Sequence, residues 1–250
     1  MAAISLPNAF APSIAGCERV YVDIGLNIGD NLRTLYEPSF AATTKKLNRT
    51  LGSLFGSVHA RSDVCTIGME PNPTHARRLA TLQKRLSERG HRVQIFGMAV
   101  SNVSGSATYW TDTAAHNIAR NGWGSSLLRW AANMDEGHAV QVPTLTLPMV
   151  LQALFPREAP KRLVGLKMDC EGCEYDAMPP AADALCSSVD VMWLERHDRF
   201  FNTKWRGHKR GFESNGRVEA LDASVRDMGH RRGCRTQVRA LTTSEYGRRV

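Results

Sequence analysis

Residues 20–31 read VYVDIGLNIGDN, and this stretch decides the fold. A continuous apolar run ends at a turn that carries Gly25 and Gly29, and a helical pattern follows the turn. Such runs are typical of strands that are buried on both faces of a parallel sheet. The glycines permit a sharp turn and a close backbone approach. Their spacing is G-x-x-x-G rather than the G-x-G-x-x-G of dinucleotide-binding turns, and Asp30 would repel a pyrophosphate. A ligand without phosphate is therefore favoured over a dinucleotide. A purely structural turn is the less favoured alternative.

Further apolar runs predict the other strands of the sheet: 65–69, 92–96, 164–168, 189–194 and, near the end of the chain, about 236–241. Helical patterns lie between them. The clearest has Asn72 as its cap, Pro73 at its first position and Gly90 after its end, and another covers about 218–228. Strands that alternate with helices predict an α/β fold with a doubly wound, mostly parallel sheet flanked by helices. Ligands of such sheets gather beyond the carboxyl ends of the strands.

Two stretches break this pattern, residues 38–62 and 112–138, and we interpret both as insertions near the mouth of the site. Alternating runs at 106–111 and 140–147 predict a small antiparallel pair of strands between the third and fourth strands of the main sheet. This pair could form a rim over the bound ligand.

The length favours one domain over residues 1–250, with a core of about 18–241 and a basic tail at 242–250. No segment reaches the roughly 18 to 20 apolar residues that a membrane span needs. The six cysteines have irregular spacing, and the first twenty residues do not read as an export signal. These features favour reduced thiols over a disulfide framework, and a cytoplasmic location.

The formal net charge of +8 is concentrated near the end of the sequence. Residues 1–195 hold 18 Lys and Arg against 18 Asp and Glu, whereas residues 196–250 hold 14 against 6. Such a positive segment favours an anionic partner, which could be a phosphorylated small molecule, a lipid head group or nucleic acid. A solvated Arg-rich segment that maintains solubility is the alternative.

Acidic residues lie at or just beyond the carboxyl ends of four predicted strands: Asp23, Glu70, Asp169 and Glu195. Glu70 is placed to accept hydrogen bonds from both hydroxyls of a ribose, unless it is a surface glutamate without a ligand.

Residues 167–174, KMDCEGCE, bring Asp169, Glu171 and Glu174 into one turn. Three carboxylates this close repel one another unless a cation, a metal or arginines share the site, or one of them holds a proton. The alternative is an ordinary acidic helix start that Lys167 neutralises. The Cys-x-x-Cys spacing in the same turn lacks a second cysteine pair, so we assign no metal site.

Seven short elements of the chain occur in an order known from one family. They are D-I-G-L-N-I-G from Asp23, M-E-P-N-P from Met69, A-V-S from Ala99, G-S-S from Gly124, V-P-T-L-T-L-P from Val142, K-M-D-C-E-G-C-E from Lys167 and E-R-H from Glu195. On these elements the chain resembles the FkbM family of S-adenosylmethionine-dependent methyltransferases over about residues 20–200. Seven ordered elements are far more specific than any one of them.

The resemblance has three departures: Leu26 replaces a small residue, Pro148 replaces an acid, and the segment 38–62 is unusual. The first two touch none of the charged positions. The seventh strand of the common methyltransferase sheet is also expected to be short or missing.

The resemblance implies a Rossmann-like methyltransferase fold, S-adenosylmethionine as cofactor and O-methylation of a sugar or another hydroxylated small molecule. Cofactor-binding residues would be Asp23, Gly25, Asn27, Gly29, Glu70, Ala99 and Asp169. Glu70 would hold the ribose, the glycine turn with Asn27 the methionine half, and Ala99 the adenine edge. Asp169 and Glu171 would face the methyl group and the acceptor, with His197 as the base because imidazole accepts a proton near neutral pH.

The acceptor is expected to be a small molecule, possibly anionic. An RNA methyltransferase that uses the basic segment is the second choice, so nucleic acid stays a possible partner. An oxidoreductase that binds a nicotinamide nucleotide shares the fold but lacks the glycine spacing. A domain that binds the cofactor without catalysis is disfavoured because every charged motif position is retained.

Overall fold

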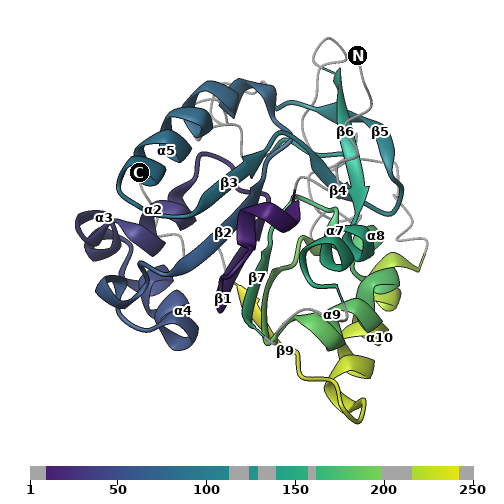
Figure 1. Cartoon of the computed structure of the whole chain (residues 1–250). Coiled ribbons are helices and arrows are strands. Elements are labelled where there is room, and N and C mark those ends of the chain that lie inside the picture. Colours follow the sequence, from purple (N-terminus) through teal and green to yellow (C-terminus); the bar gives the residue numbers. More distant parts are fainter. Residues whose placement is uncertain (1–9, 113–123, 129–138, 157–161, 199–215, 242–250) are drawn as a thin grey trace.

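The computed structural model describes residues 10–112, 124–128, 139–156, 162–198 and 216–241. Its main sheet contains six strands in the order β3-β2-β1-β7-β8-β9, and every neighbouring pair is parallel (Figure 1). Every strand predicted for this sheet is confirmed to within about two residues. The strands are β1 (Arg19–Ile24), β2 (Val64–Met69), β3 (Val93–Phe96), β7 (Leu163–Met168), β8 (Val191–Glu195) and β9 (Gln237–Leu241).

Helices cover both faces of this sheet, as the doubly wound prediction requires (Figure 1). One face packs against α2 (Asp30–Tyr36), α4 (Lys45–Phe55) and α5 (Ala76–Glu88). The other face packs against η1 (Ala11–Ile14), α7 (Leu147–Leu154), α8 (Glu174–Ala177), α9 (Ala182–Ser188) and α10 (Arg217–His230). Shorter elements complete the described chain: α3 (Pro38–Thr43), η2 (Val58–Ala60), η3 (Pro73–His75) and η5 (Pro179–Ala181).

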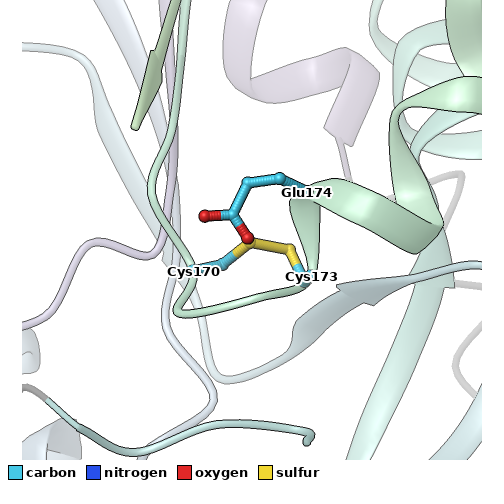
Figure 2. A group of neighbouring side chains, drawn as sticks. All are labelled: Cys170, Cys173 and Glu174. Carbon is cyan, nitrogen blue, oxygen red and sulfur yellow. A yellow bond between two sulfur atoms is a disulfide. The ribbon is translucent and has the colours of Figure 1, made fainter. Parts of the chain in front are cut away.

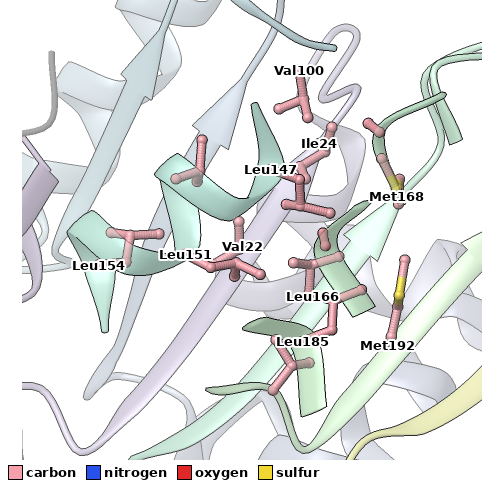
Figure 3. Packing of buried hydrophobic residues seen from close by; sticks show 14 of the residues in the cluster. Val22, Ile24, Val100, Leu147, Leu151, Leu154, Leu166, Met168, Leu185 and Met192 are labelled. Atoms are coloured by element: carbon pink, nitrogen blue, oxygen red, sulfur yellow. The ribbon is translucent and has the colours of Figure 1, made fainter. Parts of the chain in front are cut away.

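The alternation of side chains along the strands divides the core between the two faces. In β1, Val22 and Ile24 belong to the cluster under α7 and α9 (Figure 3). Tyr21 packs instead with Trp193 under α4. Asp23 has the same parity as Tyr21 and is fully buried. Since side chains alternate with a period of two, the carboxylate of Asp23 lies on the α4 side of the sheet at its carboxyl edge.

A second, three-stranded sheet follows β3 and has the order β4-β6-β5. Strands β5 (Gly105–Trp110) and β6 (Ala139–Thr146) are antiparallel, which confirms the predicted pair. Strand β4 (Ala99–Ser101) adds to β6 in parallel. Of the predicted insertion 112–138, residues 113–123 and 129–138 lie outside the described residues, as does the tail 242–250.

The segment 38–62 does not lie near the mouth of the site, and that part of the prediction is wrong. It forms α3, α4 and η2, and Leu47, Leu51 and Phe55 of α4 pack on the sheet face that carries Tyr21. Arg19, the first residue of β1, donates a hydrogen bond to the carbonyl of Phe55 at 3.2 Å, so α4 ends beside the amino ends of the strands. The apolar residues recur every four positions, a helical spacing that the polar composition of the segment obscured.

The cysteine prediction is also wrong, because all six cysteines pair. The disulfides are Cys17–Cys65, Cys170–Cys173 and Cys186–Cys234. Cys17 lies just before β1 and Cys65 in β2, so pairing of two adjacent strands brings together cysteines that are 48 residues apart. Irregular spacing carried no information on these contacts, because they arise from the tertiary fold.

Within the described residues, no seventh strand joins the main sheet. Every described helix is too short or too polar to cross a bilayer.

Candidate active site

The turn after β1 is fastened to the end of β2. The backbone amides of Gly25 and Leu26 both donate to the carbonyl of Met69, at 3.1 and 3.0 Å. Asn27 adopts a left-handed conformation with φ of 51°, and its amide donates to Oε2 of Glu70 at 2.6 Å. The residues predicted from two separate motifs, Asn27 and Glu70, therefore form one contact.

The close approach that Gly25 permits is to the protein itself. A Cβ at this position would lie 1.7 Å from the carbonyl oxygen of Asp169, and φ is +79°. At Gly29, which caps α2 with φ of +87°, a Cβ would lie 2.3 Å from Leu82 of α5. Both glycines are thus required for packing of the turn, whatever ligand the turn holds.

Glu70 is a buried carboxylate that joins two loops. Its Oε2 accepts from Asn27, and its Oε1 accepts from the amide of Asn72 at 2.8 Å. Burial raises its pKa to about 7, although the two amides act in the opposite direction. Each carboxylate oxygen has a second lone pair, so each can still accept a hydrogen bond from a hydroxyl group.

Lys167 connects the turn after β1 with the turn after β7. Its Nζ donates to the carbonyl of Gly25 at 2.7 Å and lies 3.1 Å from Oδ1 of Asp23 and 3.3 Å from Oδ2 of Asp169. Burial by itself lowers the pKa of Lys167, but the two carboxylates outweigh it and raise the pKa above its ordinary value. Asp23 and Lys167 are paired in register on adjacent strands, which places the ammonium between the two acids.

The turn after β7 has an unusual backbone. Glu171 adopts φ of 55°, a left-handed conformation that is uncommon outside glycine, and its carbonyl accepts from Oγ of Ser126 at 2.6 Å. Cys170 and Cys173 close the same turn with a disulfide, and the Glu174 carboxylate lies beside it (Figure 2). The G-S-S element and the acidic turn are therefore in direct contact.

His197 lies at the centre of the acids that follow β7. Its Nδ1 is 2.5 Å from Oε1 of Glu174, while its Nε2 is 3.3 Å from Oε2 of Glu171 and 3.7 Å from Oδ1 of Asp169. The ring is 2% exposed. Burial alone lowers the pKa of His197, but Glu171 and Glu174 outweigh it and raise the pKa well above the ordinary value. The two carboxylates thus favour the protonated imidazole, and the role of His197 as a base stays a prediction.

Glu195 ends β8 next to this group. Its side chain is buried, and burial together with the charge of Asp169 raises its pKa to about 8. The acids that meet at this edge are called the acidic cluster below: Asp23, Asp169, Glu171, Glu174 and Glu195.

Most of the predicted site residues therefore converge at one edge of the sheet: Asp23, Gly25, Asn27, Glu70, Asp169, Glu171 and His197. Ala99 begins β4, where it is buried and pairs with Thr144 of β6. Gly29 contacts α5 instead. The sequence prediction left out Lys167, Glu174 and Glu195 as site residues. A sequence signal for Lys167 existed: it is the one charged residue in an apolar strand, close to the carboxyl end where ligands bind.

A cavity of about 560 Å³ lies elsewhere, between α2 and α5. It is lined by Ile28, Arg33, Thr74, Arg77, Arg78, Thr81, Leu82 and Arg85. Glu37 pairs with Arg33 and Arg85 beside it. This positive cavity contains none of the predicted site residues, and it belongs to the outer helices rather than to the acidic cluster.

A family model described as the methyltransferase FkbM domain matches residues 23–231 of the chain. The crystal structure of methyltransferase FkbM from Methylobacillus flagellatus KT is similar at 14% sequence identity and a TM-score of 0.36. The similarity covers 68% of this chain and 30% of that chain, so the chain spans less than a third of that protein's length. A search of curated proteins found no match.

Proposed function

Because the chain belongs to the FkbM methyltransferase family, we propose that it transfers a methyl group from S-adenosylmethionine to a hydroxyl of a small molecule or sugar. The observation that carries this proposal is the convergence of seven predicted site residues at the carboxyl edge of a parallel sheet. This edge is where ligands of doubly wound folds bind.

The charge of the site fits a cationic cofactor. Of the five acids in the acidic cluster, Glu195 is mostly protonated at neutral pH because its pKa is about 8, and Lys167 and protonated His197 supply two positive charges against the other four. S-adenosylmethionine carries a sulfonium and an ammonium, so its positive half suits an edge with excess negative charge. Glu70, with a lone-pair direction left on each oxygen, suits the two hydroxyls of the ribose.

When bound, the cofactor supplies an electrophilic methyl group. We assign the binding of its methionine half to Asp23, Gly25, Asn27, Gly29 and Asp169, and the adenine edge to Ala99. Lys167 holds Asp23, Gly25 and Asp169 in one arrangement, and thereby preorganises the edge before any ligand arrives.

On the acceptor side we assign Asp169, Glu171 and His197. Glu171 takes the proton of the acceptor hydroxyl, and His197 orients Glu171 and Asp169 from Nε2. A protonated imidazole is unsuited to accepting a further proton, so His197 positions the carboxylates rather than acting as the base that the sequence predicted.

The three disulfides bear on where the protein works. Disulfides persist in oxidising compartments and are rare in cytosolic proteins. They favour an oxidising compartment over the cytoplasm that the sequence analysis expected.

Binding of S-adenosylhomocysteine tests the proposal without knowledge of the acceptor. We expect this ligand to raise the melting temperature and NADH to leave it unchanged. In Glu70→Ala, whose fold is checked by circular dichroism, affinity should fall by at least about tenfold because the charge-assisted bonds to ribose are lost.

Glu88→Gln is the control, since the Glu88 side chain is exposed on α5 and should leave affinity unchanged. Stabilisation by NADH instead, or unaltered S-adenosylhomocysteine affinity in a folded Glu70→Ala variant, would contradict the assignment. Transfer of tritiated methyl groups to sugars, lipids and RNA then identifies the acceptor class.

A further inference from the structure

Glu195 is a buried carboxylate on which His197 and Lys167 act only through their charge. Its residue is 7% exposed, and no hydrogen bond or ion pair from any described residue reaches its oxygens. Burying a carboxylate costs free energy unless it is paired, hydrogen-bonded, protonated or bound to a metal. With a pKa near 8, Glu195 meets this cost by holding a proton at neutral pH, and a cation bound beside it would take the place of that proton.

His197 is oriented in the way that histidine ligands of metals are. Glu174, which is fully buried, holds Nδ1 at 2.5 Å and is itself fixed by the amide of Gly172 at 2.7 Å. A carboxylate on one ring nitrogen turns the other nitrogen towards a metal and increases its basicity. Here Nε2 is directed towards Asp169 and Glu171.

Ligand atoms of Asp169, Glu195 and His197 lie within 4.8 Å of one another. Two atoms bound to one cation at about 2.0 to 2.2 Å lie roughly 3 to 4 Å apart, so small side-chain rotations would close the site. The separation of 3.7 Å between Nε2 and Oδ1 of Asp169 already falls in this range. The contact of Asp169 with Lys167 is through its other oxygen, Oδ2, at 3.3 Å.

We propose that Asp169, Glu195 and His197 form a binding site for a divalent cation of the Mn²⁺ class, with Glu174 as the positioning residue. Two carboxylates and one imidazole are a donor set that suits Mn²⁺ better than thiolate-preferring metals. The cation takes the place of the Nε2 proton and offsets the excess negative charge of the acidic cluster. The sequence analysis named a cation or a metal as one way to relieve the repulsion in the turn after Lys167 but assigned no metal site, because the three ligands come from the ends of two strands.

The binding site stands on this geometry alone, whereas its use rests on the proposed function. A cation held by Asp169, Glu195 and His197 would polarise the hydroxyl of the acceptor and lower its pKa, and Glu171 would take the proton. The oxygen lone pair then forms the bond to the methyl carbon as the carbon–sulfur bond breaks, and the bonding pair stays on sulfur. Hydroxylated acceptors are therefore favoured over amines.

The test is titration of the full chain, freed of metal with EDTA, with Mn²⁺ alone. Isothermal titration calorimetry and the electron paramagnetic resonance signal of free Mn²⁺ measure binding. We expect one ion per chain. Glu195→Gln should weaken binding by more than about 100-fold, since loss of a ligand exceeds the roughly 10- to 100-fold effect typical of outer-shell partners. Glu174→Gln should weaken Mn²⁺ binding by an amount within that outer-shell range. Glu88→Gln should bind Mn²⁺ as tightly as the unaltered chain does.

Glu195→Gln is expected to fold, because it replaces a carboxylate that makes no hydrogen bond or ion pair with a described residue by a neutral side chain of the same shape. Absence of Mn²⁺ binding, or unchanged binding in a folded Glu195→Gln variant, overturns the site. Each proposal fails separately: binding of S-adenosylhomocysteine without Mn²⁺ overturns the cation site alone, and binding of Mn²⁺ without S-adenosylhomocysteine overturns the proposed function alone.

Discussion

Glu70 makes the stability of the fold depend on pH. Its pKa in the folded chain is about 7, above the ordinary value near 4.3, because burial disfavours the charged form. The folded state therefore binds this proton more tightly than the unfolded state does. The resulting stabilisation is complete below about pH 4 and is lost as the pH rises through 7.

We expect Glu70→Gln to remove this dependence. Relative to the variant, the unaltered chain should lose about 2 to 3 kcal/mol of unfolding free energy between pH 5 and pH 8. Gln offers one acceptor where Glu70 offers two, so the variant also loses a hydrogen bond, but that loss is the same at both pH values. Urea denaturation at the two pH values measures the difference.

The exposed Glu88 provides the comparison for this measurement. Glu88→Gln should change the pH dependence by no more than a few tenths of a kcal/mol, as for an exposed ion pair. If Glu70→Gln and the unaltered chain lose stability in parallel from pH 5 to pH 8, Glu70 does not titrate in this range.

At the scale of elements, β9 is the edge strand whose attachment depends on a disulfide. It pairs with β8 alone, and Cys234 lies shortly before it, bonded to Cys186 of α9. Thr236 strengthens the same junction, because its hydroxyl bonds the carbonyls of Leu185 and Val189. The edge is thus fixed to the helix layer before the strand begins.

We expect the double substitution Cys186→Ser and Cys234→Ser to lower the unfolding free energy by about 3 to 4 kcal/mol. A crosslink across 48 residues restricts the unfolded chain by roughly this amount. Urea unfolding under non-reducing conditions measures the loss, and the unaltered chain in reductant should lose at least as much. Thiol titration that finds both cysteines free in the unaltered chain would refute the pairing.

At the scale of the whole molecule, three arginines near the end of the chain are paired with acids. Within residues 216–241, Arg217 pairs with Asp176, Arg231 with Asp183 and Asp227, and Arg235 with Asp190. Three of these acids come from the earlier, balanced part of the sequence. Helix α10 and β9 also belong to the α/β fold, so deletion of residues 204–250 would remove structure as well as charge.

These pairings bear on the RNA-binding alternative. We expect the full chain to bind RNA of mixed sequence only weakly at physiological salt, with a dissociation constant on the order of 10⁻⁵ M or higher and a shallow salt dependence. An arginine that already pairs with an acid is less available to bind a phosphate, so it releases fewer of the counterions that surround the nucleic acid. Fluorescence anisotropy at several salt concentrations checks this, and tight binding with a steep slope would favour an RNA acceptor.

The sequence by itself determined the order of strands and helices and the parallel main sheet. A continuous apolar run such as that at Val20–Ile24 indicates a strand that is buried on both faces, and such a run can be recognised from neighbouring residues alone. It also placed Asp23, Glu70 and Asp169 at one edge, because the carboxyl ends of parallel strands share an edge whatever the details of packing.

Only the tertiary structure decided which groups those side chains contact and how deeply they are buried. The pairing of Lys167 with Asp23 and Asp169, the carboxylates around His197, and the partners of the six cysteines all join residues from different elements. The burial that shifts the pKa of Glu70 and of Glu195 exists only once the helices cover the sheet. A linear pattern fixes which face a residue lies on, whereas distances across the fold and exclusion of water depend on how all the elements pack.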